Sequence, residues 1–230
     1  MRKGVQKIYS EVAQTYELVN HILTFGFDIR WRKAAARQAV KLGGGKFLDV
    51  CCGTGELSMY LSEILDQNTL INAVDFSYPM LKKAKARNNM SRVSLTLAEA
   101  DKLPYGDNIF DLVIISFATR NLNPRKEILR SNLMEFYRVL NRGGAFINVE
   151  TSQPLSPLLR KLFHFYIKTF VQPVGSLISG SKPGYRYLAH TIPRFYSADE
   201  LSTILNSIGF YRVTERQLLG GIACIHEAVK

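Results

Sequence analysis

The sequence has little cysteine and no long apolar run. Three of its 230 residues are cysteines, Cys51, Cys52 and Cys224, and an odd number without ligand spacing indicates reduced thiols rather than disulfides or a bound metal. No apolar segment approaches the roughly 20 residues of a membrane-spanning helix. The opening residues 1–4 lack the apolar stretch of a secretion signal. We therefore expect a cytoplasmic protein that folds as a single domain over residues 1–230.

Acidic residues are scarce beside basic ones. The chain has 19 Asp and Glu against 30 Lys and Arg, for a net charge of +11. Such a charge is typical of proteins that bind nucleic acid or an anionic membrane surface, and also of an ordinary lysine-rich surface. The basic residues are scattered rather than gathered in one block, and no repeat or low-complexity linker divides the chain. The charge by itself therefore does not choose among these partners.

Short apolar runs alternate with helical spacing through the middle of the chain. We expect strands at 47–50, 70–74, 93–97, 110–115 and 145–149, and helices at 56–65, 79–87 and 124–140, the last ending at the glycine pair 143–144. A helix at 197–208 then precedes strands at 211–215 and 222–228. This alternation predicts an α/β fold of the Rossmann-like, doubly wound kind, with a mostly parallel seven-stranded sheet.

Two segments fall outside the alternation. Residues 1–42 have helical spacing and form an expected N-terminal helical segment before a cofactor-binding core at 43–150. Residues 151–196 carry five prolines and several aromatic residues, and an interval this long between strands is typical of a substrate-covering insert or of an extra packing helix. Residues 197–230 complete the domain with the last helix and strands.

Ligand-type residues follow three of the predicted strands. Gly53, Thr54 and Gly55 come directly after the first strand, where glycines allow a sharp turn and the close approach of a ligand. Asp75 ends the second strand about 20 residues later, the spacing at which a carboxylate meets ribose hydroxyls, and Glu99 follows the third. Since open α/β sheets bind ligands at this edge, we expect a nucleotide site there. A plain tight turn and helix capping by Asp75 are the alternatives.

The residues around the glycine loop narrow the choice of nucleotide. The dinucleotide fingerprint requires a third glycine where this chain has Ser58, and no glycine-rich loop ending in Lys-Ser or Lys-Thr is present for a triphosphate. Asp49 and Glu56 flank the loop, and their charge would repel phosphates but attract a cationic group. These residues favour S-adenosylmethionine, which carries a sulfonium and an ammonium group.

With these residues in place, the chain resembles the ubiquinone/menaquinone biosynthesis C-methyltransferases nearly from end to end. The loop at 49–55 and the stretch at 103–111 are shared by many class I methyltransferases. Three narrower matches are Phe25-Gly26 with Arg30-Trp31-Arg32, Ser116-Phe117-Ala118-Thr119-Arg120-Asn121-Leu122, and Tyr185-Arg186-Tyr187-Leu188. The chain departs from the family at Cys51-Cys52, which replace smaller residues, at Glu99, where Asn or Asp is usual, and at Ala118-Thr119, where a pair with a glycine is more usual.

The resemblance implies an enzyme that uses S-adenosylmethionine, and it assigns roles around the cofactor. Gly53, Thr54 and Gly55 would line its methionine end, close to the acidic Asp49. Asp75 would hold the ribose. The remaining expected cofactor-binding residues are Glu99 and Ala100 at the adenine and Ser116 beside the cofactor.

Three residues are candidates for catalysis. A ring carbon becomes nucleophilic when a neighbouring hydroxyl loses its proton, and a quinol hydroxyl resembles phenol, whose pKa is about 10. Arg120 follows the fourth strand and is expected to stabilise the resulting oxyanion, while Asn121 and Tyr16 position the hydroxyls. A structural ion pair for Arg120 and a core position for Tyr16 remain the alternatives.

The expected substrate is a prenylated quinol precursor of menaquinone or ubiquinone, either demethylmenaquinol or demethyl-methoxybenzoquinol. Its tail would lie in an apolar tunnel between the insert and the N-terminal helices. The basic surface would then hold the enzyme at the inner face of a membrane, and we expect no nucleic-acid partner. A homodimer stays an open option. The alternatives are methyl transfer to another small molecule or to RNA, and a protein that binds S-adenosylmethionine without catalysis.

Overall fold

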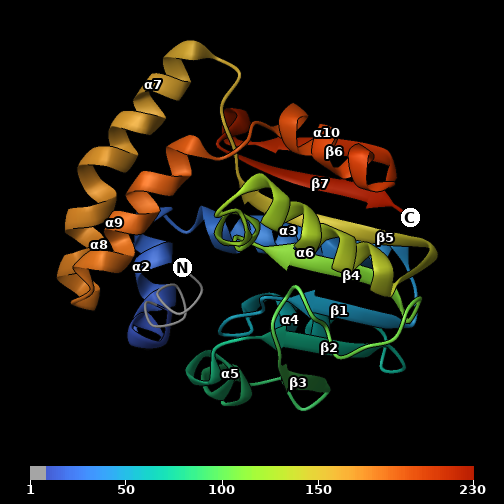
Figure 1. Cartoon of the computed structure of the whole chain (residues 1–230). Helices are drawn as coiled ribbons and strands as arrows, with labels where there is room; N and C mark the ends of the chain where they lie inside the picture. Colours follow the sequence, from blue (N-terminus) through green and yellow to red (C-terminus); the bar gives the residue numbers. More distant parts are fainter. Residues whose placement is uncertain (1–8) are drawn as a thin grey trace.

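A seven-stranded sheet forms the centre of the computed structural model, which describes residues 9–230 (Figure 1). Its strand order is β3-β2-β1-β4-β5-β7-β6, and only β7 runs antiparallel to its neighbours. The strands are β1 (Lys46–Val50), β2 (Leu70–Asp75), β3 (Val93–Leu97), β4 (Phe110–Ser116), β5 (Leu140–Thr151), β6 (Tyr211–Leu218) and β7 (Ala223–Val229). The predicted doubly wound, mostly parallel sheet is therefore confirmed.

Helices cover both faces of the sheet and pack through separate apolar clusters. On one face lie α3 (Phe27–Leu42), α4 (Glu56–Ile64) and α5 (Tyr78–Lys85). On the other face lie α6 (Lys126–Val139) and α10 (Ala198–Ile208). Helix α10 begins where the sequence predicts, because Ser197 and Glu200 form a reciprocal capping box that satisfies two backbone N–H groups.

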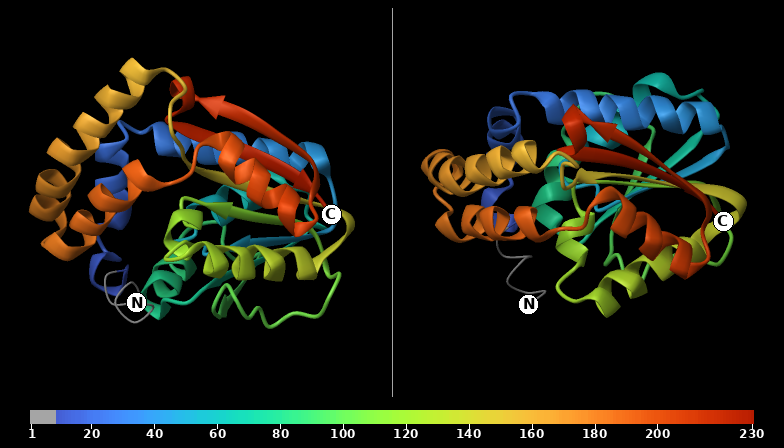
Figure 2. Two further views of the ribbon diagram at one scale, coloured as in Figure 1. Left: turned by 45° about the horizontal axis from the view of Figure 1, so that its top comes forward. Right: turned by 90° about the horizontal axis from the view of Figure 1, so that it is seen from above.

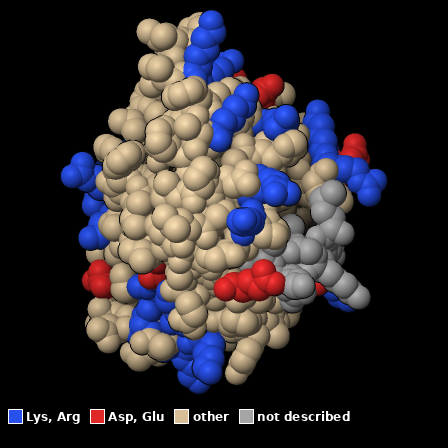
Figure 3. Space-filling view, turned by 90° about the vertical axis from the view of Figure 1, so that its left-hand side faces the viewer, with Lys and Arg blue, Asp and Glu red and all other residues tan. Residues whose placement is uncertain are grey.

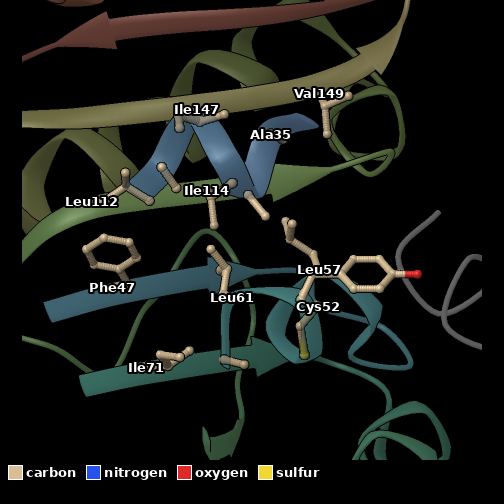
Figure 4. Close-up of a cluster of buried hydrophobic side chains, with 14 of the residues drawn as sticks. Ala35, Phe47, Cys52, Leu57, Leu61, Ile71, Leu112, Ile114, Ile147 and Val149 are labelled. Carbon is tan, nitrogen blue, oxygen red and sulfur yellow. The ribbon is translucent and has the colours of Figure 1, made fainter. Parts of the chain in front are cut away.

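Small side chains let α3 lie close to the sheet. The helix buries a row of alanines, among them Ala35, which is fully buried in the same cluster as Ile114 and Ile147 (Figure 4). Leu57 and Leu61 of α4 extend the same cluster toward β1 and β2. This packing fixes the start of α4, and with it the loop that joins β1 to α4.

The insert after β5 forms a helical layer beyond one end of the sheet (Figure 2). It contains α7 (Pro157–Tyr166), a π-helical turn η2 (Ile167–Val171), α8 (Gln172–Ser179), α9 (Lys182–Thr191) and a short turn η3 (Ile192–Arg194). Together with α2 (Tyr16–Leu23) it encloses a third apolar cluster that includes Val19, Phe163 and Tyr185. The insert and the N-terminal segment therefore pack on each other at the edge where the parallel strands end.

The structure differs from the predicted elements in two places. The helical spacing over 1–42 is broken at Phe25 and Gly26, whose positive φ angles of 51° and 72° turn the chain between α2 and α3. Strand β5 begins at Leu140 and runs through the glycine pair 143–144, which we expected to separate a helix from a strand. Phe110 pairs with Leu140 but Leu112 pairs with Ala145, and this shift in register accommodates the glycines inside the strand.

None of the helices formed by residues 9–230 is long and apolar enough to cross a membrane.

Candidate cofactor and substrate site

A cavity of about 350 Å³ lies at the carboxyl ends of the first four strands. Its walls come from the segments that follow β1, β2, β3 and β4, and from parts of the N-terminal segment, α6 and α9. Of the predicted cofactor-binding residues, Gly53, Thr54, Asp75, Glu99, Ala100 and Ser116 line it. The ends of parallel strands meet at one edge of a sheet, so residues far apart in sequence converge there.

The loop after β1 turns through three left-handed residues. The φ angles are 56° at Cys51, 56° at Gly53 and 79° at Gly55, in a region that glycine adopts most readily. A Cβ on Gly53 would meet no atom within 4 Å, so the backbone of Gly53 is open to a ligand. A Cβ on Gly55 would lie 2.9 Å from Cβ of Ala84, and Gly55 does not line the cavity. Gly55 therefore serves the packing of α5 on the loop.

Both thiols beside this loop line the cavity in the neutral form. Burial, together with the nearby carboxylates of Asp49 and Asp75, raises the pKa of Cys51 and of Cys52 well above the ordinary value. Cysteine reacts as the thiolate, so these side chains act as small apolar groups.

Asp75 joins the first two strand ends. Its carboxylate accepts the backbone N–H of Gly53 at 2.9 Å and the backbone N–H of Ser77 at 2.8 Å. Each carboxylate oxygen has a second lone pair, so the group can also accept hydroxyl protons from a ligand in the cavity. Burial raises the pKa of Asp75 to about 6, while the two backbone N–H groups oppose that shift.

Asp49 lies beneath the loop rather than in the cavity wall. Its side chain is fully buried, and one oxygen accepts a 2.5 Å hydrogen bond from Ser58 Oγ. The other oxygen has no hydrogen-bond partner among residues 9–230. Burial raises the pKa of Asp49 to about 7. The carboxyl group predicted to contact the cofactor therefore does not line the cavity.

The segment after β4 brings the aromatic ring of Phe117 to the cavity wall. Phe117 has a positive φ of 53° and packs against Trp31, with ring centroids 6.0 Å apart, while the guanidinium of Arg32 lies 4.9 Å from its centroid. Ser116 and Phe117 line one side of the cavity, and Glu99 and Ala100 line another. Phe117 was not among the predicted site residues.

Three tyrosines and one asparagine line the end of the cavity nearest the insert. Tyr9 and Tyr16 come from the N-terminal segment, Tyr187 from α9 and Asn121 from the turn η1 (Thr119–Leu122). The Asn121 amide donates a 2.6 Å hydrogen bond to the Tyr9 hydroxyl, and Asn121 Oδ1 is buried with no partner in the described chain. Burial raises the pKa of each of the three tyrosines, so their hydroxyls stay protonated at neutral pH.

Arg120 lies just behind this wall and does not line the cavity. Its side chain is buried, Nη1 donates to Thr191 Oγ1 at 3.0 Å, and Nε lies 3.9 Å from the buried carboxylate of Glu150. The structural ion pair that the sequence left open is therefore present. The positive charge still acts on the cavity, since it opposes the burial that raises the pKa values of Tyr9, Tyr16 and Tyr187.

Four ionisable residues form a network where α2, α3 and α4 meet. Arg32 lies 2.6 Å from Asp28 and 3.4 Å from Glu56, and the two nitrogens of His21 lie 2.9 Å from Asp28 and 3.4 Å from Glu56. The arrangement brings three metal-ligand types together, but the Arg32 guanidinium occupies the space between the two carboxylates. Arg32 and Glu56 also line the cavity, so the network adds one charge of each sign to its wall.

Helix α2 is held over the site by a second set of ion pairs. Glu17 pairs with Arg87 at 2.5 Å and with Lys83 of α5 at 3.5 Å. The same Arg87 donates from Nε to the carbonyl of Thr54 at 2.6 Å. Lys83 also donates to the carbonyl of Gln14 at 3.1 Å. The N-terminal segment is thus joined to the glycine loop through one guanidinium.

A second, much smaller cavity of about 10 Å³ lies where the N-terminal segment meets α9. It shares Tyr9, Tyr16 and Tyr187 with the main cavity, and its far end reaches Tyr185 and Leu188. The space is closed to a prenyl chain, so the expected tunnel is a narrow seam between packed helices.

The donor set fits S-adenosylmethionine. Asp75 offers an acceptor for ribose hydroxyls, and the open backbone at Gly53 allows the close approach of a ligand. Glu56 in the wall and Asp49 beneath the loop provide the negative potential that a sulfonium and an ammonium group require.

Comparison with known proteins gives the same answer. The profile of the ubiE/COQ5 methyltransferase family matches residues 1–230. A demethylmenaquinone methyltransferase from Alkalihalophilus pseudofirmus is 32% identical over 98% of this chain and 95% of its own length. A protein from Geotalea uraniireducens named ubiquinone/menaquinone biosynthesis C-methyltransferase is also 32% identical, over 98% and 96% of the two chains.

Solved structures share the fold at lower identity. A methyltransferase from Thermotoga maritima superposes with a TM-score of 0.66 at 20% identity, covering 97% of this chain and 99% of its own. One from Aquifex aeolicus gives 0.59 at 20% identity, covering 84% and 88%. Because the family profile spans the whole sequence, the chain belongs to the ubiE/COQ5 methyltransferase family and is a methyltransferase that uses S-adenosylmethionine.

Proposed function

We propose that this methyltransferase acts on a ring carbon of a prenylated quinol, either demethylmenaquinol or demethyl-methoxybenzoquinol, at the inner face of a membrane. The names of its relatives support this class of substrate. The observation that carries the proposal is the pairing of Asn121 with Tyr9, in which the buried amide oxygen at the wall of the cavity has no partner among residues 9–230. A buried acceptor of this kind favours a ligand that brings a hydroxyl group.

The three tyrosines support the same proposal. Because burial keeps their hydroxyls protonated, they can donate hydrogen bonds to an oxyanion but cannot take its proton at neutral pH, so the quinol hydroxyl gives its proton to solvent water. Lowering a phenol pKa from about 10 to about 7 requires roughly 4 kcal/mol of preferential stabilisation of the anion. One aimed donor is worth about 3 kcal/mol in comparable sites, so Tyr16 with the charge of Arg120 behind it supplies the required magnitude.

The protein also orients the quinol ring toward the methyl group and keeps water out of the cavity. When bound, S-adenosylmethionine supplies the methyl group and the positive sulfur that leaves with the electron pair of the broken bond. Asn121 orients the ring through its hydroxyl, and Phe117 and Tyr187 provide flat surfaces on the cavity wall. The second cavity continues from the three tyrosines toward Tyr185 and Leu188 and gives the direction in which the prenyl tail leaves, which requires the closed seam between the helices to open.

A methyl-transfer assay with labelled cofactor tests the proposal. We expect transfer to chemically reduced demethylmenaquinol and demethyl-methoxybenzoquinol analogues with short tails, and none to their oxidised quinones, which have no hydroxyl to ionise. Binding of the cofactor by calorimetry without transfer to either quinol would overturn the proposal in favour of a non-catalytic binder. Transfer to RNA instead would identify a different substrate class.

A further inference from the structure

The outer surface of the insert is both apolar and exclusively basic. Residues 151–196 contain no Asp or Glu, although the chain has 19 of them. The same residues contain six basic side chains, all exposed: Arg160, Lys161, Lys168, Lys182, Arg186 and Arg194. Figure 3 shows this side of the molecule, where blue side chains stand among a broad tan surface and red atoms lie toward the lower part and the margins.

Large apolar side chains are exposed on the same element. Leu158, Leu162 and Phe165 of α7 are 69%, 57% and 64% exposed. Their spacing of four and three residues places them on one stripe of the helix, whereas Phe163 faces the core. Exposed apolar stripes of this kind mark contact surfaces, because isolated exposed leucines are common but aligned ones are not.

The stripe is bordered by charge on one side and by aromatic rings on the other. Lys161 lies on the adjacent face of the helix, by helical spacing, and Lys168 follows seven residues later. Tyr166 stacks on Phe170 at 5.4 Å between ring centroids and contacts the exposed Phe25 at 6.1 Å. An apolar stripe with a lysine border and flanking aromatics has the chemistry of a helix that lies in a lipid interface.

We propose that this surface, made of Leu158, Leu162 and Phe165 with Lys161 and Lys168 and here named the α7 face, docks on an anionic lipid bilayer. The absence of acidic residues from the whole insert is the argument for this occupant, since a lysine border without carboxylates complements anionic headgroups. The inference deepens the proposed function: the insert that carries the α7 face also contributes Tyr187 to the cavity, so docking brings the cavity to the layer that holds a prenylated substrate.

Vesicle co-sedimentation tests the docking. We expect the full chain to bind vesicles of 70% phosphatidylcholine and 30% phosphatidylglycerol at low salt, and to bind much less at 0.5 M salt or to phosphatidylcholine alone. The double variant Lys161→Glu with Lys168→Glu should weaken binding at least about 30-fold, since each basic residue near the surface is worth about fivefold. Leu158→Gln with Leu162→Gln should weaken it about tenfold or more.

Matched controls distinguish binding through the α7 face from nonspecific effects of charge and exposed apolar side chains. Arg37→Glu with Lys41→Glu on α3 removes the same charge from another exposed surface, and Ile64→Gln with Leu70→Gln removes exposed apolar groups elsewhere. Both should bind nearly as well as the parent. Equal loss of binding in the α7-face and charge-control variants would overturn the proposal in favour of diffuse attraction. A change from dimer to monomer in the leucine variant, without vesicle binding by the parent, would assign the face to a second copy.

Activity toward a short-tailed, water-soluble quinol distinguishes this inference from the proposed function. All four double variants change exposed residues outside the cavity and should keep that activity. If the parent enzyme methylates the soluble quinol but does not bind anionic vesicles, the docking inference is wrong and the proposed function stands. If vesicles bind and no quinol is methylated, the docking surface stands and the substrate class is wrong.

Discussion

The carboxylate of Asp75 accepts the backbone N–H of Gly53 at 2.9 Å, so the residue at the end of β2 holds the loop that follows β1. One side chain therefore both shapes the glycine loop and faces the cavity.

Replacing Asp75 by Asn should weaken cofactor binding by about 10- to 100-fold, because hydrogen bonds to a charged group are worth about 1.5–3 kcal/mol. The pKa of Asp75 is raised to about 6, so the carboxylate protonates as the pH falls through 6 and affinity should fall with it. Calorimetric titration at pH 5 and pH 8 measures both effects. An affinity that is the same at both pH values in the parent, or a full-affinity Asn variant, would contradict this role.

Cofactor binding should release a proton near pH 6.5. The pKa of the buried Asp49 is about 7, and a cation bound above the loop favours its ionised form and lowers that pKa. The binding enthalpy should therefore depend on the ionisation enthalpy of the buffer at pH 6.5, and much less at pH 8.5, where Asp49 is already ionised. In Asp49→Asn, the binding enthalpy at pH 6.5 should depend less on the buffer than in the parent. An unchanged dependence in that variant would mean that the proton comes from another group.

Asp49 also links folding to pH. Its folded-state pKa lies above the unfolded value of about 3.9, so its contribution to stability is fully present below pH 4 and is lost as the pH rises through 7. We therefore compare the melting temperature of Asp49→Asn with that of the parent in the absence of ligand. The difference should favour the variant more at pH 8 than at pH 5. Thermal melts at the two pH values measure the difference, and parallel shifts at both would contradict it.

Asn121→Ala should lower kcat by about 100-fold or more while the cofactor dissociation constant changes little, because the amide faces the substrate end of the cavity. Tyr9→Phe removes only the hydroxyl that pairs with the amide, so a smaller loss is expected. Steady-state kinetics with the soluble quinol, beside calorimetry with the cofactor, provide the two readouts. A parallel loss of cofactor binding would indicate a structural role for Asn121.

The effects of Arg120 on stability and on catalysis should be measurable separately. Arg120→Met leaves Glu150 buried without its partner and should lower the free energy of unfolding by about 3–5 kcal/mol. Adding Glu150→Gln removes the stranded charge and should restore part of the stability, because the amide oxygen can still accept the backbone N–H of residue 120, while the amide NH2 cannot replace the oxygen that accepts from Thr151. We expect kcat to stay low in the stable double variant. Recovery of kcat together with stability would make Arg120 purely structural.

Gly175→Ala should destabilise the insert by about 1–3 kcal/mol. A Cβ at this position would lie 2.1 Å from the ring of Tyr185, a buried residue of α9. Gly106→Ala is the matched control, since its Cβ would meet Ile109 at an ordinary 3.8 Å. Chemical denaturation of both variants measures the difference, and equal stabilities would mean that the two helices separate without cost.

Most of the sheet could be predicted because its signals are local. Strands buried on both faces, such as β4, appear as continuous apolar runs, and the helix after Ser197 begins with its own capping residues. The errors lie where tertiary contacts override local pattern. The glycine pair 143–144 is typical of a helix end, but pairing of β5 with β4 and β7 extends the strand through it.

The convergence of the expected cofactor residues on one cavity could be predicted more easily than the tyrosines that line its other end. Gly53, Asp75 and Glu99 follow strands that the sequence reveals, so their convergence follows from the topology. Tyr9 and Tyr187 reach the cavity only because the N-terminal segment packs on the insert, a contact that no periodicity encodes. Whether Arg120 faced the cavity or an acidic partner depended on the position of Glu150, 30 residues away on another strand.

The single guanidinium of Arg87 ties the cover of the cavity to its floor, because it bonds Glu17 of α2 on one side and the carbonyl of Thr54 on the other. A displacement of α2 would therefore strain the glycine loop as well, so the position of the N-terminal segment and the shape of the expected cofactor site are mechanically coupled.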